Sequence, residues 1–173
     1  PFLGDSAIRH MGAVLEEIEQ RLYPLLASKH TAMPVVPEGA RQSTLNINSI
    51  HGGEPEPEPG YTGLPAPCVA DRCRIILDRR YLIEEDIAEV KAEVTGLLDG
   101  LKAQRAGFDY AIRDLFEVQP TMTARDAPIV RSTAAAIERV LGQVADFVVS
   151  PGTYDQKHID RIGRLKNCIA YGP

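Results

Sequence analysis

The sequence lacks the features that mark secreted, membrane-spanning or nucleic-acid-binding proteins. Its 173 residues include only three cysteines, Cys68, Cys73 and Cys168, an odd number without a CxxC pair. This argues against a disulfide framework and favours a reducing cytoplasm, where we expect all three to be small buried apolar side chains. No run approaches the roughly 18 apolar residues that a membrane span needs, and no signal peptide is visible. The net charge is −5 without a long basic run, so neither a membrane nor a nucleic acid is an expected partner.

The motifs of common catalytic and metal centres are missing as well. The four histidines, His10, His30, His51 and His158, are far apart and form no HxxxH or HxH pair. Asp155 and His158 could lie one helical turn apart and reach a cation, but such a lone pair is more often a surface hydrogen bond. There is no serine nucleophile elbow and no glycine loop for a phosphate. From its own residues we therefore expect this chain to hold no catalytic group and no metal.

What remains is the composition of an ordinary soluble globular protein. Apolar residues make up 44% of the chain and charged residues 25%. The length suffices for one good core, or for a small domain with an appendage. The sequence starts at Pro1 without a methionine, which we interpret as a trimmed or processed start.

Apolar periodicity predicts a helix followed by a strand. Apolar residues recur at three- and four-residue steps from about Asp5 to Tyr23, with Asp5 or Ser6 as the cap. Pro24 should end or kink this helix, because proline has no N–H to donate. Residues 43–51 then alternate between apolar and polar side chains, which indicates a half-buried strand. A Glu-Pro tract at residues 54–60 follows and should be an extended, solvated loop.

A second strand is predicted from Cys73 to about Ile83, then a helix and a third strand. The helix begins near residues 84–86, whose acidic side chains suit a helix N-terminus. Its apolar stripe consists of Ile87, Val90, Val94, Leu97, Leu98 and Leu101. Residues 110–118 alternate again and predict a strand that Pro120 ends.

This order of elements favours an α+β fold in which two helices cover one face of a small antiparallel sheet. A ferredoxin-like βαββαβ unit would need one more strand before Asp5, so we expect the first strand to be missing. Beyond Pro120 the pattern changes to a short α/β segment. It comprises a helix capped by Asp126, strands at residues 147–149 and 168–171, and a polar loop between them.

Two adjacent arginines are the candidate binding groups that the residues themselves suggest. Arg79 and Arg80 lie inside the second predicted strand, beside Asp78. A guanidinium held on a strand is a ready fork for a substrate carboxylate. Equally, both arginines could simply pair with Asp78, Asp71 or Glu84. The sequence leaves these two interpretations open.

Four stretches together resemble the acetylornithine deacetylase / succinyl-diaminopimelate desuccinylase family of dinuclear zinc peptidases and deacylases. Pro1–Ala7 is similar to the sequence after that family's His-Ser-Ser motif, and Leu45–Gly53 to the strand that ends in paired glycines. Val69–Arg80 resembles its Val-Pro-Asp stretch and Asp-x-Arg strand, and Cys168–Pro173 the strand and Gly-Pro before the last metal-binding histidine.

The resemblance implies a two-domain organisation. Residues 1–118 would be the dimerisation (lid) domain without its first strand, and residues 119–173 a returning segment of the zinc-binding catalytic domain. In that family two zinc ions, or cobalt, lower the pKa of a shared water, and a glutamate acts as general base on an amide carbonyl. Those ligands would lie before Pro1 and after Pro173. This fragment alone should therefore be inactive, while its parent hydrolyses a small N-acylated amino acid or peptide as a homodimer.

Few functional residues carry over from the resemblance. Arg80 matches the lid arginine that holds the substrate's carboxylate, and Gly152 and Thr153 fall in a region that lines the substrate site. The family's lid asparagine is replaced here by Pro67, which puts the substrate's identity in doubt. The alternative function is a free-standing ferredoxin-like ligand-binding or regulatory module, with Arg80 as an anion site and no catalysis.

Overall fold

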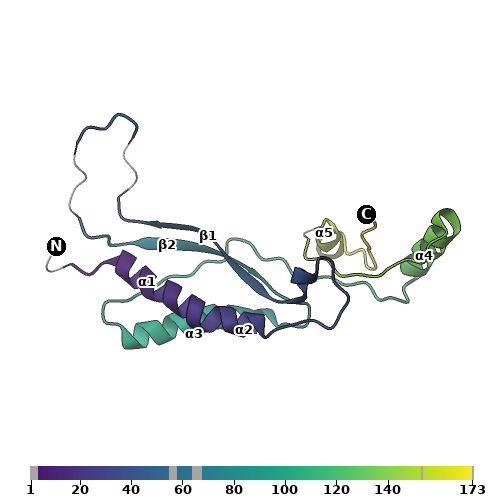
Figure 1. Ribbon diagram of the computed structural model, residues 1–173, viewed down its shortest axis with the longest axis horizontal. Helices are drawn as coiled ribbons and strands as arrows, with labels where there is room; N and C mark the ends of the chain where they lie inside the picture. Colours follow the sequence, from purple (N-terminus) through teal and green to yellow (C-terminus); the bar gives the residue numbers. More distant parts are fainter. Residues whose placement is uncertain (1–3, 55–57, 64–67, 153, 173) are drawn as a thin grey trace. The chain divides into compact units, whose positions relative to one another are not determined.

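The computed structural model describes residues 4–54, 58–63, 68–152 and 154–172, and the chain forms two compact units (Figure 1). The first unit consists of Pro1–His30, Gln42–Tyr81 and Glu85–Ile112. The second consists of Thr31–Arg41, Leu82–Glu84 and Arg113–Pro173. The boundary expected near residue 118 stays a prediction.

The first unit begins with one long helical segment. The helix α1 (Ala7–Glu17), the π-helical turn η1 (Ile18–Leu22) and α2 (Tyr23–Ala27) follow without a break, and Ser6 caps the start. Of the two effects expected of Pro24, an end or a kink, the end does not occur, because the helix continues to Ala27. In the wider turn before it, the N–H of Tyr23 donates to the carbonyl of Ile18, and this change of pattern accommodates a residue without an N–H.

A hairpin of two antiparallel strands forms the sheet of this unit. The strand β1 (Thr44–Gly52) pairs with β2 (Cys73–Arg80), which ends earlier than the sequence pattern predicted. The register shifts between Ile47 and Ser49, which leaves an extra residue on β1 as a bulge. Before that bulge, alternation places Leu45 and Ile47 on the face that packs on the core.

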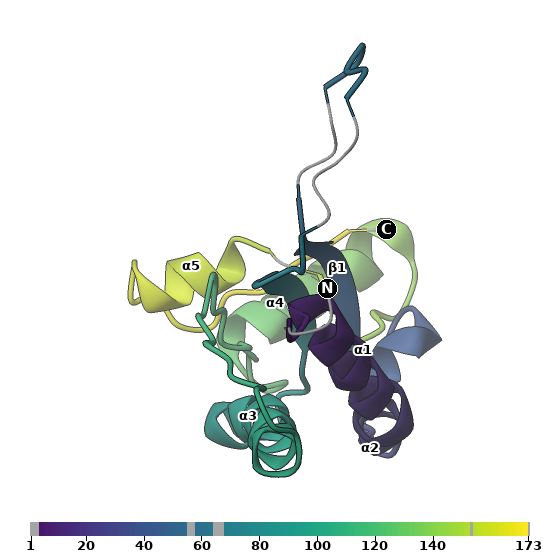
Figure 2. The same cartoon turned by 90° about the vertical axis from the view of Figure 1, so that its left-hand side faces the viewer.

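The helix α3 (Ile87–Gln104) completes the core. Asp86 caps it by accepting hydrogen bonds from the backbone N–H groups of Ala88 and Glu89. Both long helical segments lie on the same side of the hairpin (Figure 2). Their stripes and the sheet enclose one cluster of buried side chains: Met11, Val14, Ile18, Leu22, Leu26, Leu45, Leu97, Leu101 and Phe108. The predicted α+β class, with helices against an antiparallel sheet, is confirmed.

The strand predicted at residues 110–118 is not formed. This stretch carries no strand hydrogen bonds, although Phe108 just before it is buried in the core and Tyr110 donates to Asp99 at 2.6 Å. A strand exists only beside a neighbour, and the sheet in the described residues contains β1 and β2 alone. Alternation alone therefore does not make this stretch a strand of the described sheet.

The second unit contains a short 3-10 helix, η2 (Glu38–Arg41), and the helices α4 (Pro128–Leu141) and α5 (Gln156–Arg161). Several expectations for it were wrong. Asp126 does not cap α4, whose N-cap position is Ala127 without a side-chain bond. Residues 147–149 form only a single bridge, Val35 to Val149, and residues 168–171 form no strand, because neither has a neighbouring strand in this unit. The polar segment expected as a loop contains α5, whose first turn closes on the carbonyl of Asp155.

The cysteines are all free, but they are not uniformly buried. Cys73 and Cys168 are partly buried, whereas Cys68 is exposed and contacts Glu54 at 3.2 Å. The expectation of three buried thiols is therefore wrong for Cys68. Part of the Glu-Pro tract and Pro67 lie outside the described residues. No helix that the structure describes is long and apolar enough to cross a membrane.

Candidate functional site

Arg79 and Arg80 are neighbours in sequence but lie on opposite faces of the hairpin. In the register of the strands, Arg79 is opposite Leu45 and Arg80 is opposite Thr44. Since successive strand side chains alternate, Arg79 shares the helix-covered face with Leu45, and Arg80 lies on the open face. The side chain of Arg79 is 9% exposed and that of Arg80 is 60% exposed. The fold therefore gives the two guanidinium groups different environments.

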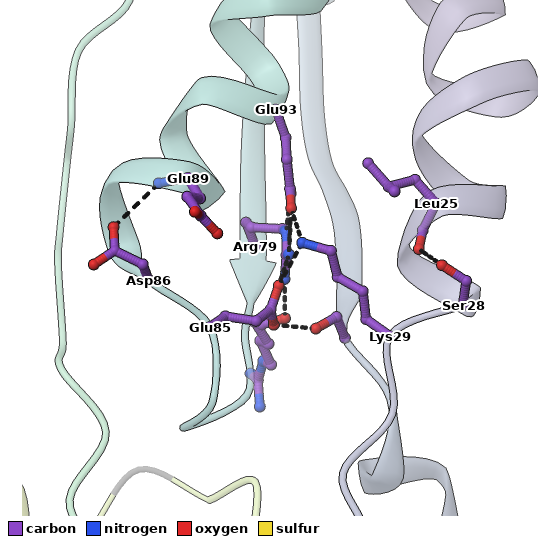
Figure 3. A network of polar contacts seen from close by, with 10 residues as sticks. Leu25, Ser28, Lys29, Arg79, Glu85, Asp86, Glu89 and Glu93 are labelled. Carbon is purple, nitrogen blue, oxygen red and sulfur yellow. Dashed lines mark hydrogen bonds and ion pairs between the residues drawn. The ribbon is translucent and has the colours of Figure 1, made fainter.

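The guanidinium of Arg79 is enclosed by two carboxylates (Figure 3). Its Nε donates to Glu93 at 3.0 Å and its Nη2 to Glu85 at 2.7 Å. Its Nη1 donates to the backbone carbonyl of Arg80 at 2.5 Å. These contacts connect the end of β2 to the start of α3. They occupy all three nitrogens of the Arg79 guanidinium with partners inside the protein.

Lys29 and Ser43 complete this buried cluster. The ammonium of Lys29 lies 2.9 Å from Glu85 and also contacts Glu93, and the hydroxyl of Ser43 donates to Glu85. Two cations and two carboxylates balance, as buried charges must. Desolvation by burial would lower the pKa of Lys29, but hydrogen bonds to Glu93 and Glu85 outweigh it and raise that pKa above its ordinary 10.5.

Among the described residues, the side chain of Arg80 makes only long contacts. Its Nε and Nη2 lie 3.4 Å from the carboxylate of Asp78, which is itself 41% exposed. An exposed ion pair of this length contributes little to stability, and water or a ligand can readily replace Asp78 as the partner of Arg80. Of the two arginines, Arg80 is thus the one that can offer its planar fork to an external carboxylate.

The role of Arg80 stays a prediction, and the sequence interpretation did not identify the partners of Arg79. It named Asp78, Asp71 and Glu84 as alternatives, whereas Arg79 pairs with Glu85 and Glu93. A signal was present, because Glu93 follows Val90 by three positions within the apolar stripe of α3. A carboxylate in such a stripe predicts a buried cation partner.

The other two predicted binding residues belong to the second unit. The N–H of Gly152 donates to the Ser150 hydroxyl at 3.2 Å, and a Cβ there would lie 2.9 Å from the Tyr154 ring. Thr153 lies outside the described residues. A substrate role for Gly152 and Thr153 stays a prediction.

A second polar cluster joins the start of α1 to the end of α3. His10 is buried, its Nε2 lies 2.8 Å from Asp5, and its Nδ1 accepts from Nε of Arg105 at 2.6 Å. Since arginine only donates, the hydrogen of neutral His10 is on Nε2 and points at Asp5. The hydrogen bond from His10 holds the pKa of Asp5 below its ordinary 3.8. Both ring nitrogens are engaged, so His10 has a structural role.

The described residues do not provide a metal site. They bring together no group of three histidine, cysteine, aspartate or glutamate side chains that could hold an ion. The zinc or cobalt that the resemblance implies therefore does not fit this part of the chain, and no chemistry of a metal is assigned to its residues. What the structure does offer is a helix-backed hairpin with an exposed arginine.

The architecture of the first unit is that of a small two-layer α+β domain. The sequence of the chain matches the family model of the peptidase dimerisation domain over residues 1–106. The chain belongs to this family, the dimerisation domain of M20 peptidases. Comparisons with curated proteins and with solved structures found no match. The chain thus carries the dimerisation domain of a peptidase-family hydrolase, and the broader part of the predicted function is confirmed.

Proposed function

We propose that this chain serves a metal-dependent amide hydrolase in two ways: it joins two subunits, and its Arg80 binds the carboxylate of an N-acylated amino acid or peptide. The parent enzyme would belong to the acetylornithine deacetylase / succinyl-diaminopimelate desuccinylase branch. Its zinc or cobalt would be held by residues outside this chain. The observation that carries the proposal is the exposed, weakly paired Arg80 in a domain of a peptidase family.

Dimerisation would use the outer edge of β1. In the described residues β1 pairs only with β2, so one side of a nine-residue strand has free backbone groups. A ferredoxin-like unit pairs its first strand with the strand equivalent to β2, which leaves β1 as the outer strand. Two copies related by a two-fold axis could pair these edges into one continuous sheet.

The exposed Arg80 suits a carboxylate for reasons of geometry as well as charge. Its neighbour Arg79 is neutralised by Glu85 and Glu93, so the positive field on the open face comes from Arg80 rather than from both arginines. A guanidinium binds a carboxylate through two parallel N–H···O bonds. Asp78 holds the fork only loosely until the substrate arrives.

Hydrolysis of a panel of N-acyl amino acids by the full-length protein tests the catalytic part. We expect activity that disappears with a chelator and returns with zinc or cobalt. Arg80→Ala should raise KM far more than it lowers kcat, because the arginine holds the substrate rather than the reacting bond. A full-length protein that binds acyl amino acids without cleaving them would instead be a regulatory binding module.

Light scattering tests the dimerisation part separately. We expect the chain to show twice the mass of one copy at micromolar concentration. A strict monomer over the whole accessible concentration range would contradict pairing through β1. Localisation in the cytoplasm remains part of the proposal, and a fusion of the full-length protein to a fluorescent reporter would test it.

A further inference from the structure

The buried cluster around Arg79 contacts the residue proposed to bind substrate, although Arg79 itself cannot reach the open face. Its Nη1 donates at 2.5 Å to the backbone carbonyl of Arg80. The same guanidinium is held at Nε and Nη2 by Glu93 and Glu85. The backbone from which the Arg80 side chain projects is therefore fixed from the helix-covered face.

The cluster draws its members from every element that meets at this corner of the first unit. Lys29 follows α2, Ser43 precedes β1, Glu85 precedes α3 and Glu93 lies on α3. Glu93 is 8% exposed and Glu85 is 10% exposed, so both carboxylates are largely removed from water. Low local dielectric strengthens such contacts and restricts their geometry.

The presence of this cluster is not explained by net stability alone. Buried ion pairs often add little to net stability compared with apolar packing, and this unit also has a hydrophobic core. The best-attested use of such pairs is to define one arrangement among several. Here the arrangement that they define is the end of β2, where the strand stops at Arg80.

From this geometry we infer that Arg79 is a positioning residue for Arg80. By clamping the Arg80 carbonyl, it fixes the direction in which the neighbouring guanidinium meets a substrate carboxylate. The inference rests on the proposed function, because it concerns the same substrate carboxylate. Glu93 and Glu85 hold Arg79 in place, so they influence Arg80 indirectly, through Arg79.

Lysine is the informative replacement at position 79. It keeps the positive charge between Glu85 and Glu93, but it lacks the fork that reaches the carboxylates and the Arg80 carbonyl at the same time. A merely structural role would lower activity on every substrate alike. A positioning role would lower it only for substrates that carry the carboxylate.

The test therefore compares two substrates in the full-length protein. One is the best N-acyl amino acid of the panel, and the other is the same compound with its carboxylate replaced by a neutral carboxamide. The measured quantity is the ratio of kcat/KM for the two. Arg79→Lys should reduce this ratio roughly tenfold, about the effect of losing one charge-assisted hydrogen bond, with kcat/KM for the carboxamide little changed.

Two further variants make the outcome decisive. Arg80→Ala should reduce the same ratio at least as strongly, and Glu93→Gln, which preserves the shape of the side chain, should act in the same direction as Arg79→Lys. Arg74→Lys is the matched control, because Arg74 is an exposed arginine on the same strand outside the cluster. It should leave the ratio unchanged.

The possible results separate the inference from the proposed function. Suppose that Arg80→Ala lowers the ratio. If Arg79→Lys then leaves the ratio unchanged, or lowers kcat/KM equally for both substrates, Arg79 does not position Arg80. If Arg80→Ala leaves the ratio unchanged, the proposed carboxylate role of Arg80 is wrong, and the inference falls with it. Circular dichroism and thermal unfolding of each variant identify any loss that comes from misfolding.

Discussion

The two units use the same kind of amphipathic helix with opposite results. In the first unit, the stripe of α3 is covered, and Val90, Leu97 and Leu101 are buried. In the second unit, the stripe of α4 has one buried member, Val130, while Leu141 is 53% exposed. Periodicity therefore identifies the apolar face of a helix, whereas the burial of that face depends on which other elements pack against it.

Polar contacts differ between the units in the same way. The buried cluster of the first unit includes ion pairs between residues far apart in sequence, such as Lys29 with Glu85 and Lys29 with Glu93. A typical pair in the second unit, Lys166 with Asp160, is local and exposed on its lysine side. Buried pairs between distant residues connect separate elements of the fold. Local surface pairs contribute little to the free energy of unfolding.

The largest difference should come from deletion of core volume. Leu26 is 2% exposed and lies in the main cluster, so Leu26→Ala should lower the free energy of unfolding by about 3 kcal/mol. Leu165 of the second unit is 63% exposed, and Leu165→Ala should change it by less than about 0.5 kcal/mol. Urea unfolding followed by circular dichroism measures both. Equal effects would mean that the two units are packed alike.

Removing one charge from the buried cluster should have the next largest effect. Glu93→Gln keeps the volume but weakens the contacts to Lys29 and Arg79, and we expect a loss of about 2 kcal/mol. The control is Asp160→Asn, whose partner Lys166 is 73% exposed, with an expected change below about 0.5 kcal/mol. The same urea experiment decides. A neutral Glu93→Gln would show that the cluster does not stabilise the first unit.

Helix capping offers a smaller contrast. Asp86 accepts two backbone hydrogen bonds at the start of α3, so Asp86→Ala should cost about 1 kcal/mol. Asp126 lies one residue before Ala127, the N-cap position of α4, and makes no capping bond. Asp126→Ala should therefore change the free energy of unfolding by less than about 0.5 kcal/mol, as at an ordinary surface position. A comparable loss in the two variants would restore the capping role that the sequence suggested for Asp126.

The smallest effect concerns the acid limb of the pH dependence. Because the folded-state pKa of Asp5 is below its ordinary 3.8, its contribution to stability is present above that value and is lost as the pH falls through the folded-state pKa. Carbon-detected NMR titration of the Asp5 carboxyl should give a midpoint below 3.8. In His10→Gln the midpoint should move up towards the ordinary value. An unchanged midpoint would remove His10 as the cause.

Sequence reasoning was most successful where the determinants are local. The helix stripes, the strand at Thr44–Gly52 and the acidic start of α3 follow from spacing and from the chemistry of helix ends. It did not anticipate that a five-residue π-helical turn would let the helix continue past Pro24, which has no N–H. It failed at residues 110–118, where alternation is present but the sheet of the described residues contains β1 and β2 alone.

The candidate site shows the same division. The strand pattern singled out Arg79 and Arg80 but could not choose between them, since charge and propensity are the same for both, and only the family resemblance pointed to Arg80. Register and alternation made the choice by directing one to each face of the hairpin. The place of Glu93 in an apolar stripe indicates that it has a buried cation partner, but the sequence pattern does not identify that partner as Arg79.

By itself, the sequence determined the class of the fold, the apolar face of each main helix and the presence of an arginine pair on a strand. These follow from periodicity, capping and composition, which act over a few residues. Only the tertiary structure decided that Arg79 is neutralised by Glu85 and Glu93 while Arg80 remains exposed. The physical reason is that burial and ion pairing depend on which elements meet in space, and one strand places adjacent side chains in opposite environments.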